Sequence, residues 1–407
     1  MGDTRAEQRA ARRAELLRFL AGAEHPLGFG WLREDGSLDT TRPVELWITC
    51  RMTHVAALGV LAAEEPAPGG PSRERLAALA AHGVRSLTGP LHDAQHGGWF
   101  AAVGADGPTA TAKQAYGHAF VVLAASSAVA AGVTAAEPLL AEALAVSTER
   151  FWDDEAGLGV EDWDRAWSAL EDYRGVNSNM HTVEAYLAAA DVTGDHVWRE
   201  RAGRIAGHVV DWAVANDWRI PEHFDREWRP LLEYNADRPA DQFRPYGATV
   251  GHGLEWARLL LSIDASLTVQ APAGLAEAAV ALYDRAVADG WAADGADGFV
   301  YTTDWQGRPV VRDRMHWVLA EAIGAAEALH KVTGGQRYAD DVDRWWAYAD
   351  RYLVDHQLGS WHHELDPTNR PAGTVWPGKP DVYHAYQAAL IAEVPLVPSF
   401  AAALAAR

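Results

Sequence analysis

Six histidines recur along this sequence at intervals of 63 to 71 residues: His54, His118, His181, His252, His316 and His384. Each stands near the beginning of an alanine- and leucine-rich segment with helical periodicity. An imidazole has an unperturbed pKa of about 6.5, so it can accept or donate a proton near neutral pH. The repeat therefore predicts one pocket for acid–base chemistry. Three of the six, His54, His118 and His316, have an equal claim to a structural role in the core.

His252 and His384 have the local sequences that most favour a functional role. Glycines flank His252, so no bulky side chain blocks a ligand that approaches the imidazole. Glu255 follows three residues later, where its carboxylate can meet either the imidazole or the substrate. His384 follows a stiff segment rich in proline and glycine, residues 376–381, which we expect to hold it at the mouth of the pocket.

Polar and aromatic residues on the same segments could hold a ligand. Arg51 and Trp47 share a helix face, and an arginine in an apolar run needs an acceptor. The other candidates are Tyr116 as a hydrogen-bonding group, the face formed by Asn177, His181 and Glu184, and Trp317 with Glu321. The structural alternatives are an internal ion pair for Arg51, a buried polar network for the Asn177 face, and core packing for Trp317.

About twelve helical segments must position these residues. They cover residues 4–21, 42–63, 72–89, 110–131, 135–151, 177–192, 196–216, 246–264, 272–289, 313–332, 336–356 and 382–394. Glycine- and aromatic-rich turns, such as 28–31, 97–100 and 359–362, follow the first helix of each pair. Six helix pairs of about 65 residues predict a closed repeat. We expect an all-α, single-domain (α/α)6 barrel over residues 1–407, with short β-hairpins in the loops at one mouth.

Composition limits the possible partners. The formal net charge of −21 argues against nucleic acid or anionic membranes. One cysteine, Cys50, excludes an internal disulfide, and the N-terminus lacks the apolar core of a signal peptide, so we expect a cytoplasmic protein. No apolar stretch is long enough to span a membrane. There is no P-loop and no dinucleotide fingerprint, so no cofactor is expected.

Two other chemistries fit the pattern less well. A metal site would need closely spaced ligands, and the nearest cluster, residues 362–364, lies in a predicted hairpin where neighbouring side chains point to opposite faces. No metal is therefore expected. A glycoside hydrolase of the same fold would use two carboxylates, with Asp172, Glu184, Glu255 and Glu321 as candidates, but none is as prominent as His252 or His384.

Five motifs together resemble the N-acylglucosamine 2-epimerase superfamily. They are residues 51–54, 113–120, 177–181, 243–252 and 376–384, and the resemblance runs from about residue 25 to 395. Val250 stands where the family pattern has proline. The branch that the motifs resemble holds bacterial D-mannose isomerases and sulfoquinovose isomerases. The resemblance implies an (α/α)6 barrel, a cis-enediol intermediate and no metal.

The resemblance also assigns roles. It implies that His252 and His384 are the acid–base pair, with His252 moving the proton between C2 and C1 and His384 opening the sugar ring. It places Arg51, Tyr116, Asn177, His181, Arg244 and Glu255 around the sugar. Arg51 and His181 would stabilise the enediolate oxygen.

We expect an isomerase that interconverts D-mannose and D-fructose, with D-lyxose and D-xylulose as a further pair. Sulfoquinovose isomerase, a C2 epimerase and, more remotely, a glycoside hydrolase remain alternatives. A non-catalytic carbohydrate-binding protein is the last alternative. The expected partner is a small-molecule sugar, and the chain is expected to be a monomer or a small homo-oligomer.

Overall fold

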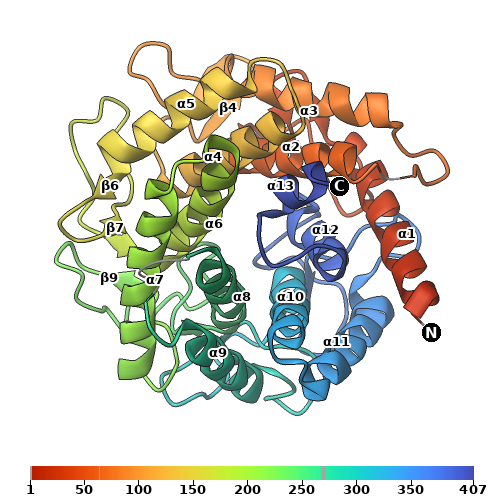
Figure 1. Ribbon diagram of the computed structural model, residues 1–407, viewed down its shortest axis with the longest axis vertical. Coiled ribbons are helices and arrows are strands. Elements are labelled where there is room, and N and C mark those ends of the chain that lie inside the picture. Colours follow the sequence, from red (N-terminus) through yellow and green to blue (C-terminus); the bar gives the residue numbers. More distant parts are fainter. Residues whose placement is uncertain (1, 64, 268–271) are drawn as a thin grey trace.

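Two concentric rings of helices build the protein, as the computed structural model shows for residues 2–63, 65–267 and 272–407 (Figure 1). The inner ring consists of α2 (Leu46–Leu61), α4 (Ala115–Ala130), α6 (Val176–Thr193), α8 (Val250–Ser266), α10 (His316–Thr333) and α12 (Tyr383–Leu390). The outer ring consists of α1 (Gly2–Ala21), α3 (Arg73–Leu87), α5 (Ala136–Val146), α7 (Val197–Ala215), α9 (Leu275–Gly290) and α11 (Gln336–Tyr348). The predicted (α/α)6 barrel is confirmed, and every predicted segment contains a helix.

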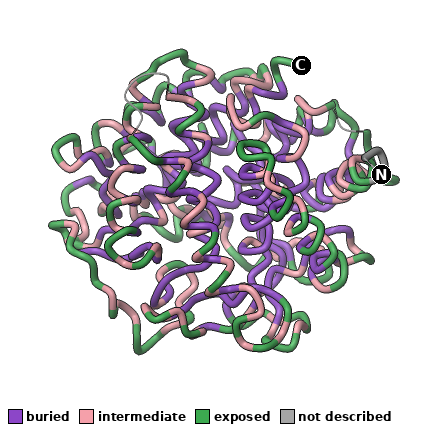
Figure 2. The backbone as a smooth tube through the Cα atoms, turned by 60° about the horizontal axis from the view of Figure 1, so that its bottom comes forward, coloured by how far each residue is buried: buried purple, intermediate pink, exposed green. Residues whose placement is uncertain are grey.

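The two rings differ in how much of each helix is buried. Nearly the whole of α4 is buried, because α4 has neighbours on every side and few polar side chains. By contrast, α11 buries only Tyr338, Val342, Trp345 and Tyr348, which recur at helical spacing along one face. A helix that is apolar all round must lie inside, whereas an amphipathic helix can cover it. Figure 2 shows this burial concentrated in the middle of the molecule.

Short antiparallel ladders tie neighbouring repeats together where the inner helices begin. Four of them are β3 (Val44–Glu45) with β4 (Ala102–Gly104), β8 (Arg174–Gly175) with β9 (His223–Phe224), β10 (Ala248–Thr249) with β11 (Thr302–Thr303), and β12 (Arg314–Met315) with β13 (Glu364–Leu365). Each joins the residues before an inner helix to the turn after the next outer helix. Smaller hairpins pair β1 (Glu24–His25) with β2 (Gly28–Phe29), β4 with β5 (Gly107–Ala110), and β6 (Trp152–Asp153) with β7 (Leu158–Gly159).

These ladders explain why several inner helices begin later than the sequence predicts. The segment expected from 42 begins with β3, and α2 starts at Leu46. The segments expected from 246 and from 313 start as strands, and α8 and α10 begin at Val250 and His316. Gly247 makes the close approach of β10 to β11 possible. Its φ is 89°, and a Cβ there would lie 2.1 Å from the carbonyl oxygen of Thr303.

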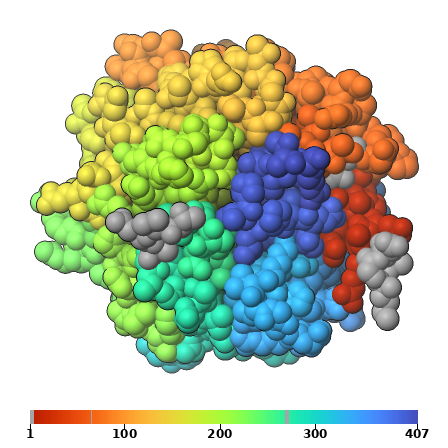
Figure 3. All heavy atoms as spheres, in the orientation of Figure 1, coloured from red at the N-terminus to blue at the C-terminus, as the bar shows by residue number. Residues whose placement is uncertain are grey.

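The opposite end of the barrel is covered by the C-terminal residues. Helix α13 (Phe400–Ala405), which was not predicted from the sequence, packs against α2, α4 and α6. In Figure 3 these residues, in dark blue, lie over the middle of that face. The ring itself is completed by α12, which contacts both α10 and α2. Within the described residues, the helices are too short or too polar to cross a bilayer.

Candidate active site

One pocket of about 550 Å³ opens at the end of the barrel where the inner helices begin. The repeat brings the first turns of these helices to one mouth, so residues far apart in sequence converge there. The lining residues are Arg51, Tyr116, Asn177, His181, Gln242, Phe243, Pro245, His252, Glu255, Tyr301, His316, Trp317, His363, Trp376, Pro380, Asp381 and His384. Eight of the ten residues predicted for the site are among them.

His252 stands on the first turn of α8 against a buried carboxylate. Oε2 of Glu222 lies 2.9 Å from Nδ1 of the imidazole, and both residues are almost completely buried. Glu255 was expected to meet either this imidazole or the substrate; the structure puts Glu222 at the imidazole and Glu255 in the lining of the pocket. Glu222 comes from the segment that precedes β9, 30 residues earlier in the chain. With a carboxylate at Nδ1, Nε2 is left as the atom that can exchange a proton with a ligand.

His384, on the first turn of α12, has a matching partner. Its Nδ1 donates to Oε1 of Glu321 (2.8 Å), and Oε2 of Glu321 accepts from Nε of Arg258 (3.1 Å). Burial and the positive charge of Arg51 lower the pKa of His384 well below its usual value. Glu321 does not line the pocket, so it holds the imidazole from behind and does not face a ligand.

An indole ring lies next to both imidazoles. The ring of Trp317 lies 5.2 Å from that of His252 and 5.8 Å from that of His384, measured between ring centroids. Gly251 makes this arrangement possible, because a Cβ there would lie 2.3 Å from Cζ3 of Trp317. The indole therefore forms the wall between the two histidines.

Arg51 is the cation of the pocket. Its guanidinium donates to Oδ2 of Asp381 (3.1 Å) and to the hydroxyl of Tyr116 (2.8 Å), while its Nε has no partner among the described residues. Burial alone would lower the pKa of Arg51, but Tyr116 and Asp381 outweigh it and raise that pKa. Burial also raises the pKa of Tyr116 to about 12. The pair thus presents a fixed positive charge and a neutral hydroxyl.

Charged side chains form the floor of the pocket. Glu184 accepts hydrogen bonds from the hydroxyl of Tyr383 and from Nε2 of Gln387 (3.1 Å). Burial and the charge of Glu321 raise the pKa of Glu255 well above its usual value. Burial lowers the pKa of His181 to about 4. At neutral pH this floor therefore offers an uncharged imidazole and a carboxyl group that tends to keep its proton.

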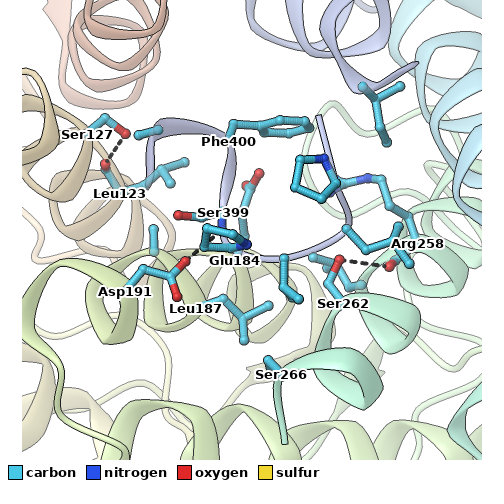
Figure 4. Close-up of a pocket in the computed structure, with 18 of the residues that line it drawn as sticks. Leu123, Ser127, Glu184, Leu187, Asp191, Arg258, Ser262, Ser266, Ser399 and Phe400 are labelled. Carbon is cyan, nitrogen blue, oxygen red and sulfur yellow. Dashed lines mark hydrogen bonds between the residues drawn. The ribbon is translucent and has the colours of Figure 1, made fainter. Parts of the chain in front are cut away.

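A second cavity of about 730 Å³ lies on the other side of this floor, under the C-terminal residues. Figure 4 shows Glu184, Asp191 and Arg258 around it, with Ser399 and Phe400 above. The two cavities have no lining residue in common. This floor thus separates the pocket at the mouth of the barrel from the cavity at the other end.

Arg244 lies outside the catalytic pocket. Its guanidinium stands 3.9 Å from the ring centroid of Tyr173 and donates to Oε1 of Glu171 (2.5 Å). It lines a neighbouring hollow together with Glu161 and Asp162. Arg244 was predicted to contact the sugar, but its side chain lines this hollow and not the pocket that contains His252 and His384.

Three histidines had an equal claim to a structural role; two of them lie in the core and the third lines the pocket. His54 contacts Oγ of Ser127 through Nδ1 (2.7 Å) and Nε2 of Gln387 through its other nitrogen (3.3 Å). His118 contacts the carbonyl of Gln114 (2.7 Å) and accepts from the amide of Trp99 (3.2 Å). Both imidazoles therefore make hydrogen bonds to other residues inside the core. His316 instead lines the pocket, stacked on another imidazole.

Several pocket residues were missed by sequence reasoning. His363 stacks on His316 with 3.8 Å between ring centroids, although its segment had been set aside as a hairpin. Its neighbour Glu364 points the other way and accepts hydrogen bonds from the backbone amides of residues 374–376. This carboxylate fixes the segment that leads to Asp381 and His384. The remaining missed residues are Gln242, Phe243, Pro245, Tyr301, Trp376, Pro380 and Asp381.

Comparison with known proteins defines the class. The profile of the N-acylglucosamine 2-epimerase (GlcNAc 2-epimerase) family matches residues 28–388. The protein is an isomerase built on an (α/α)6 barrel, and the chain belongs to the N-acylglucosamine 2-epimerase family. A D-mannose isomerase of Thermobifida fusca is 53% identical, with 98% of each chain covered. One from Pseudomonas cannabina pv. alisalensis is 48% identical, covering 96% of this chain and 93% of that one.

Solved structures agree with this assignment. A crystal structure of a D-mannose isomerase superposes with a TM-score of 0.86 at 26% identity, covering 96% of this chain and 97% of that one. The cellobiose 2-epimerase of Spirochaeta thermophila shares the fold, with a TM-score of 0.79 at 23% identity and 96% of each chain covered.

Proposed function

We propose that this protein interconverts D-mannose and D-fructose by proton transfer between side chains, without a metal ion, and that residues 1–407 act as one domain. The observation that carries the proposal is the pair of histidine–carboxylate contacts, His252 with Glu222 and His384 with Glu321, whose imidazoles line one pocket. The two relatives that are 53% and 48% identical, both D-mannose isomerases, support the choice of sugar.

In the proposed reaction His252 moves the proton between carbons. It removes the proton from C2 of the open-chain aldose and returns it to C1, while the hydroxyl proton passes from O2 to O1. Glu222 at Nδ1 favours the protonated imidazole that forms midway, which is the usual role of a carboxylate behind a general base. The net change is an aldose converted into a ketose.

His384 is proposed to open the ring before that step. It transfers the proton of the anomeric hydroxyl to the ring oxygen, which releases the aldehyde. Its buried position keeps the imidazole neutral, because burial and Arg51 lower its pKa, so it begins as a base. Trp317, between the two imidazoles, offers a flat apolar surface to the sugar ring.

Negative charge on the enediolate oxygens needs nearby donors, and the pocket has them. Arg51 supplies a fixed positive charge, and Glu255 supplies a carboxyl group that tends to keep its proton. Donors that are aimed at developing charge in a water-poor site usually contribute more to catalysis than any other single effect. Tyr116, Asn177 and His181 would complete the set of groups around the sugar hydroxyls.

The charges that line the pocket favour a neutral hexose over a sulfonated one. Among the described lining residues, Arg51 is the only arginine or lysine, and it already pairs with Asp381. A sulfonate on C6 would need a cation of its own. Sulfoquinovose and epimerisation at C2 therefore enter the test as outcomes to be distinguished.

The test is incubation of the EDTA-treated protein with D-mannose in deuterated water, followed by NMR analysis of the products. We expect D-fructose, with deuterium at C1 in the fraction of turnovers in which the His252 imidazolium exchanges its proton with solvent before returning it, and loss of activity by at least about 1,000-fold in His252→Asn and in His384→Asn. D-glucose as the main product would indicate an epimerase. No conversion of mannose, together with turnover of sulfoquinovose, would overturn the proposal.

A further inference from the structure

A buried cluster in the floor of the pocket leaves ligand atoms without partners. Nδ1 of His181 lies 3.9 Å from Oε2 of Glu184 and 3.9 Å from Oε1 of Glu255, and the three side chains offer ligand atoms that lie within 4.8 Å of one another. Among the described residues, this nitrogen and both carboxylate oxygens of Glu255 have no hydrogen-bond partner. His181 is 4% exposed and Glu255 only 1%, so water does not readily satisfy these atoms.

The charges around this cluster are unbalanced. Four buried carboxylates, Glu184, Glu255, Glu321 and Asp381, stand near two buried guanidiniums, Arg51 and Arg258. Each guanidinium is committed to a carboxylate, Arg51 to Asp381 at 3.1 Å and Arg258 to Glu321 at 3.1 Å. Nη2 of Arg258 also lies 3.6 Å from Oε1 of Glu255. Because Glu255 tends to keep its proton, a divalent cation here would displace that proton and would also balance the charge of Glu184.

The ligand atoms of these three side chains favour some cations over others. Zn²⁺ takes imidazole nitrogen and carboxylate oxygen at about 2.0–2.2 Å in tetrahedral geometry, which places ligand atoms roughly 3.3–3.5 Å apart. The observed 3.9 Å separations are within about half an ångström of that requirement. Mg²⁺ and Ca²⁺ prefer sets made of oxygen alone. One imidazole with two carboxylates therefore suits zinc, with the fourth position open toward the pocket.

A neighbouring group, Glu255 with Glu321 and His384, also offers one imidazole and two carboxylates, but two of its members already bind other side chains. His384 and Glu321 are already bonded to each other, and Glu321 also holds Arg258. A metal there would have to break both contacts. In the His181 group, Glu184 accepts hydrogen bonds from Tyr383 and Gln387, but Nδ1 of His181 and both carboxylate oxygens of Glu255 have no hydrogen-bond partner among the described residues.

We propose that His181, Glu184 and Glu255 form an inhibitory zinc site in the floor of the catalytic pocket. The bound ion would stand among the residues that line the pocket and would compete with the sugar for it. The zinc site itself does not depend on which reaction the protein catalyses, whereas the inhibition rests on the proposed isomerase function.

The experiment is a titration of the metal-free protein with Zn²⁺ alone, in competition with a chromophoric chelator. We expect one ion per chain, with affinity at least about tenfold weaker in Glu184→Gln and in Glu255→Gln. Glu142→Gln is the matched control, because Glu142 contacts His92 at 2.7 Å on the surface and should leave zinc binding unchanged. In mannose assays we expect zinc to raise the apparent KM, and EDTA to reverse the effect.

A second measurement keeps the test decisive if a variant folds poorly. Crystals of the wild-type protein soaked in Zn²⁺ should show an anomalous peak between His181, Glu184 and Glu255. A peak elsewhere, no stoichiometric ion, or equal affinity in wild type and both variants would overturn the site. Zinc binding without isomerase activity would leave the site standing and overturn the proposed function instead.

Discussion

The replacement Glu321→Gln tests whether Glu321 positions a histidine that is proposed to be catalytic or contacts the sugar itself. Sequence reasoning placed Glu321 against the substrate, whereas the structure puts its carboxylate behind His384, 2.8 Å from Nδ1. Glutamine keeps the shape and an oxygen that can accept from Nδ1, but it removes the negative charge. We therefore expect the change to act on proton transfer and not on sugar binding.

The magnitude follows from the contact that is lost. A hydrogen bond to a charged group contributes about 1.5–3 kcal/mol, and about 1.36 kcal/mol corresponds to a tenfold change in rate. We expect kcat to fall roughly 10- to 150-fold while KM stays within about twofold. Initial rates of ketose formation over a range of mannose concentrations at pH 7 measure both constants.

Two controls show whether the variant is folded and whether the effect is specific to Glu321. Arg258 loses its partner in Glu321→Gln, so thermal unfolding should confirm that the variant is folded at the assay temperature. Glu142→Gln, at an exposed histidine–glutamate contact, should leave both constants unchanged. A raised KM with an unchanged kcat would refute the positioning role and restore the interpretation that Glu321 contacts the sugar.

Three further predictions concern packing, a buried ion pair and pH. Gly251→Ala should lower kcat/KM at least about tenfold in the mannose assay, because the new methyl group displaces Trp317 from between the two histidines; an unchanged value would contradict the role given to the indole. Asp93→Asn should cost about 3–5 kcal/mol of unfolding free energy at pH 7, because it removes the negative charge that the fully buried Lys113 pairs with at 3.0 Å, and urea unfolding measures this loss. Burial and the charge of Asp162 raise the pKa of Glu161 to about 8. The folded state then binds a proton that the unfolded state releases above about 4.5, so stability falls as pH rises from about 4.5 to 8. Glu161→Gln should make this decline smaller by a few kcal/mol when unfolding at pH 5 is compared with pH 8, and an unchanged decline would refute the assignment.

The helices were predictable because their signals are local. Helical periodicity and the spacing of the histidines depend only on residues within a few turns of each other, and a closed ring is the simplest way to bury six repeated helix pairs. The ends of the helices were less predictable. The segments expected from 246 and 313 begin as strands, because their backbone groups pair with β11 and β13 from the next repeat.

The sequence alone indicates that the repeated histidines converge, and the repeat carries His181, His252, His316 and His384 to one pocket. The tertiary structure decides that the other two, His54 and His118, make hydrogen bonds in the core instead. The carboxylate that serves each imidazole, by contrast, depends on the assembled ring. Glu222 and Glu321 stand 30 and 63 residues before their histidines, so no helical spacing links each pair. Glu255, which does have that spacing from His252, packs instead into the charged floor. A contact between repeats depends on how the ring closes, and closure is a property of the whole chain.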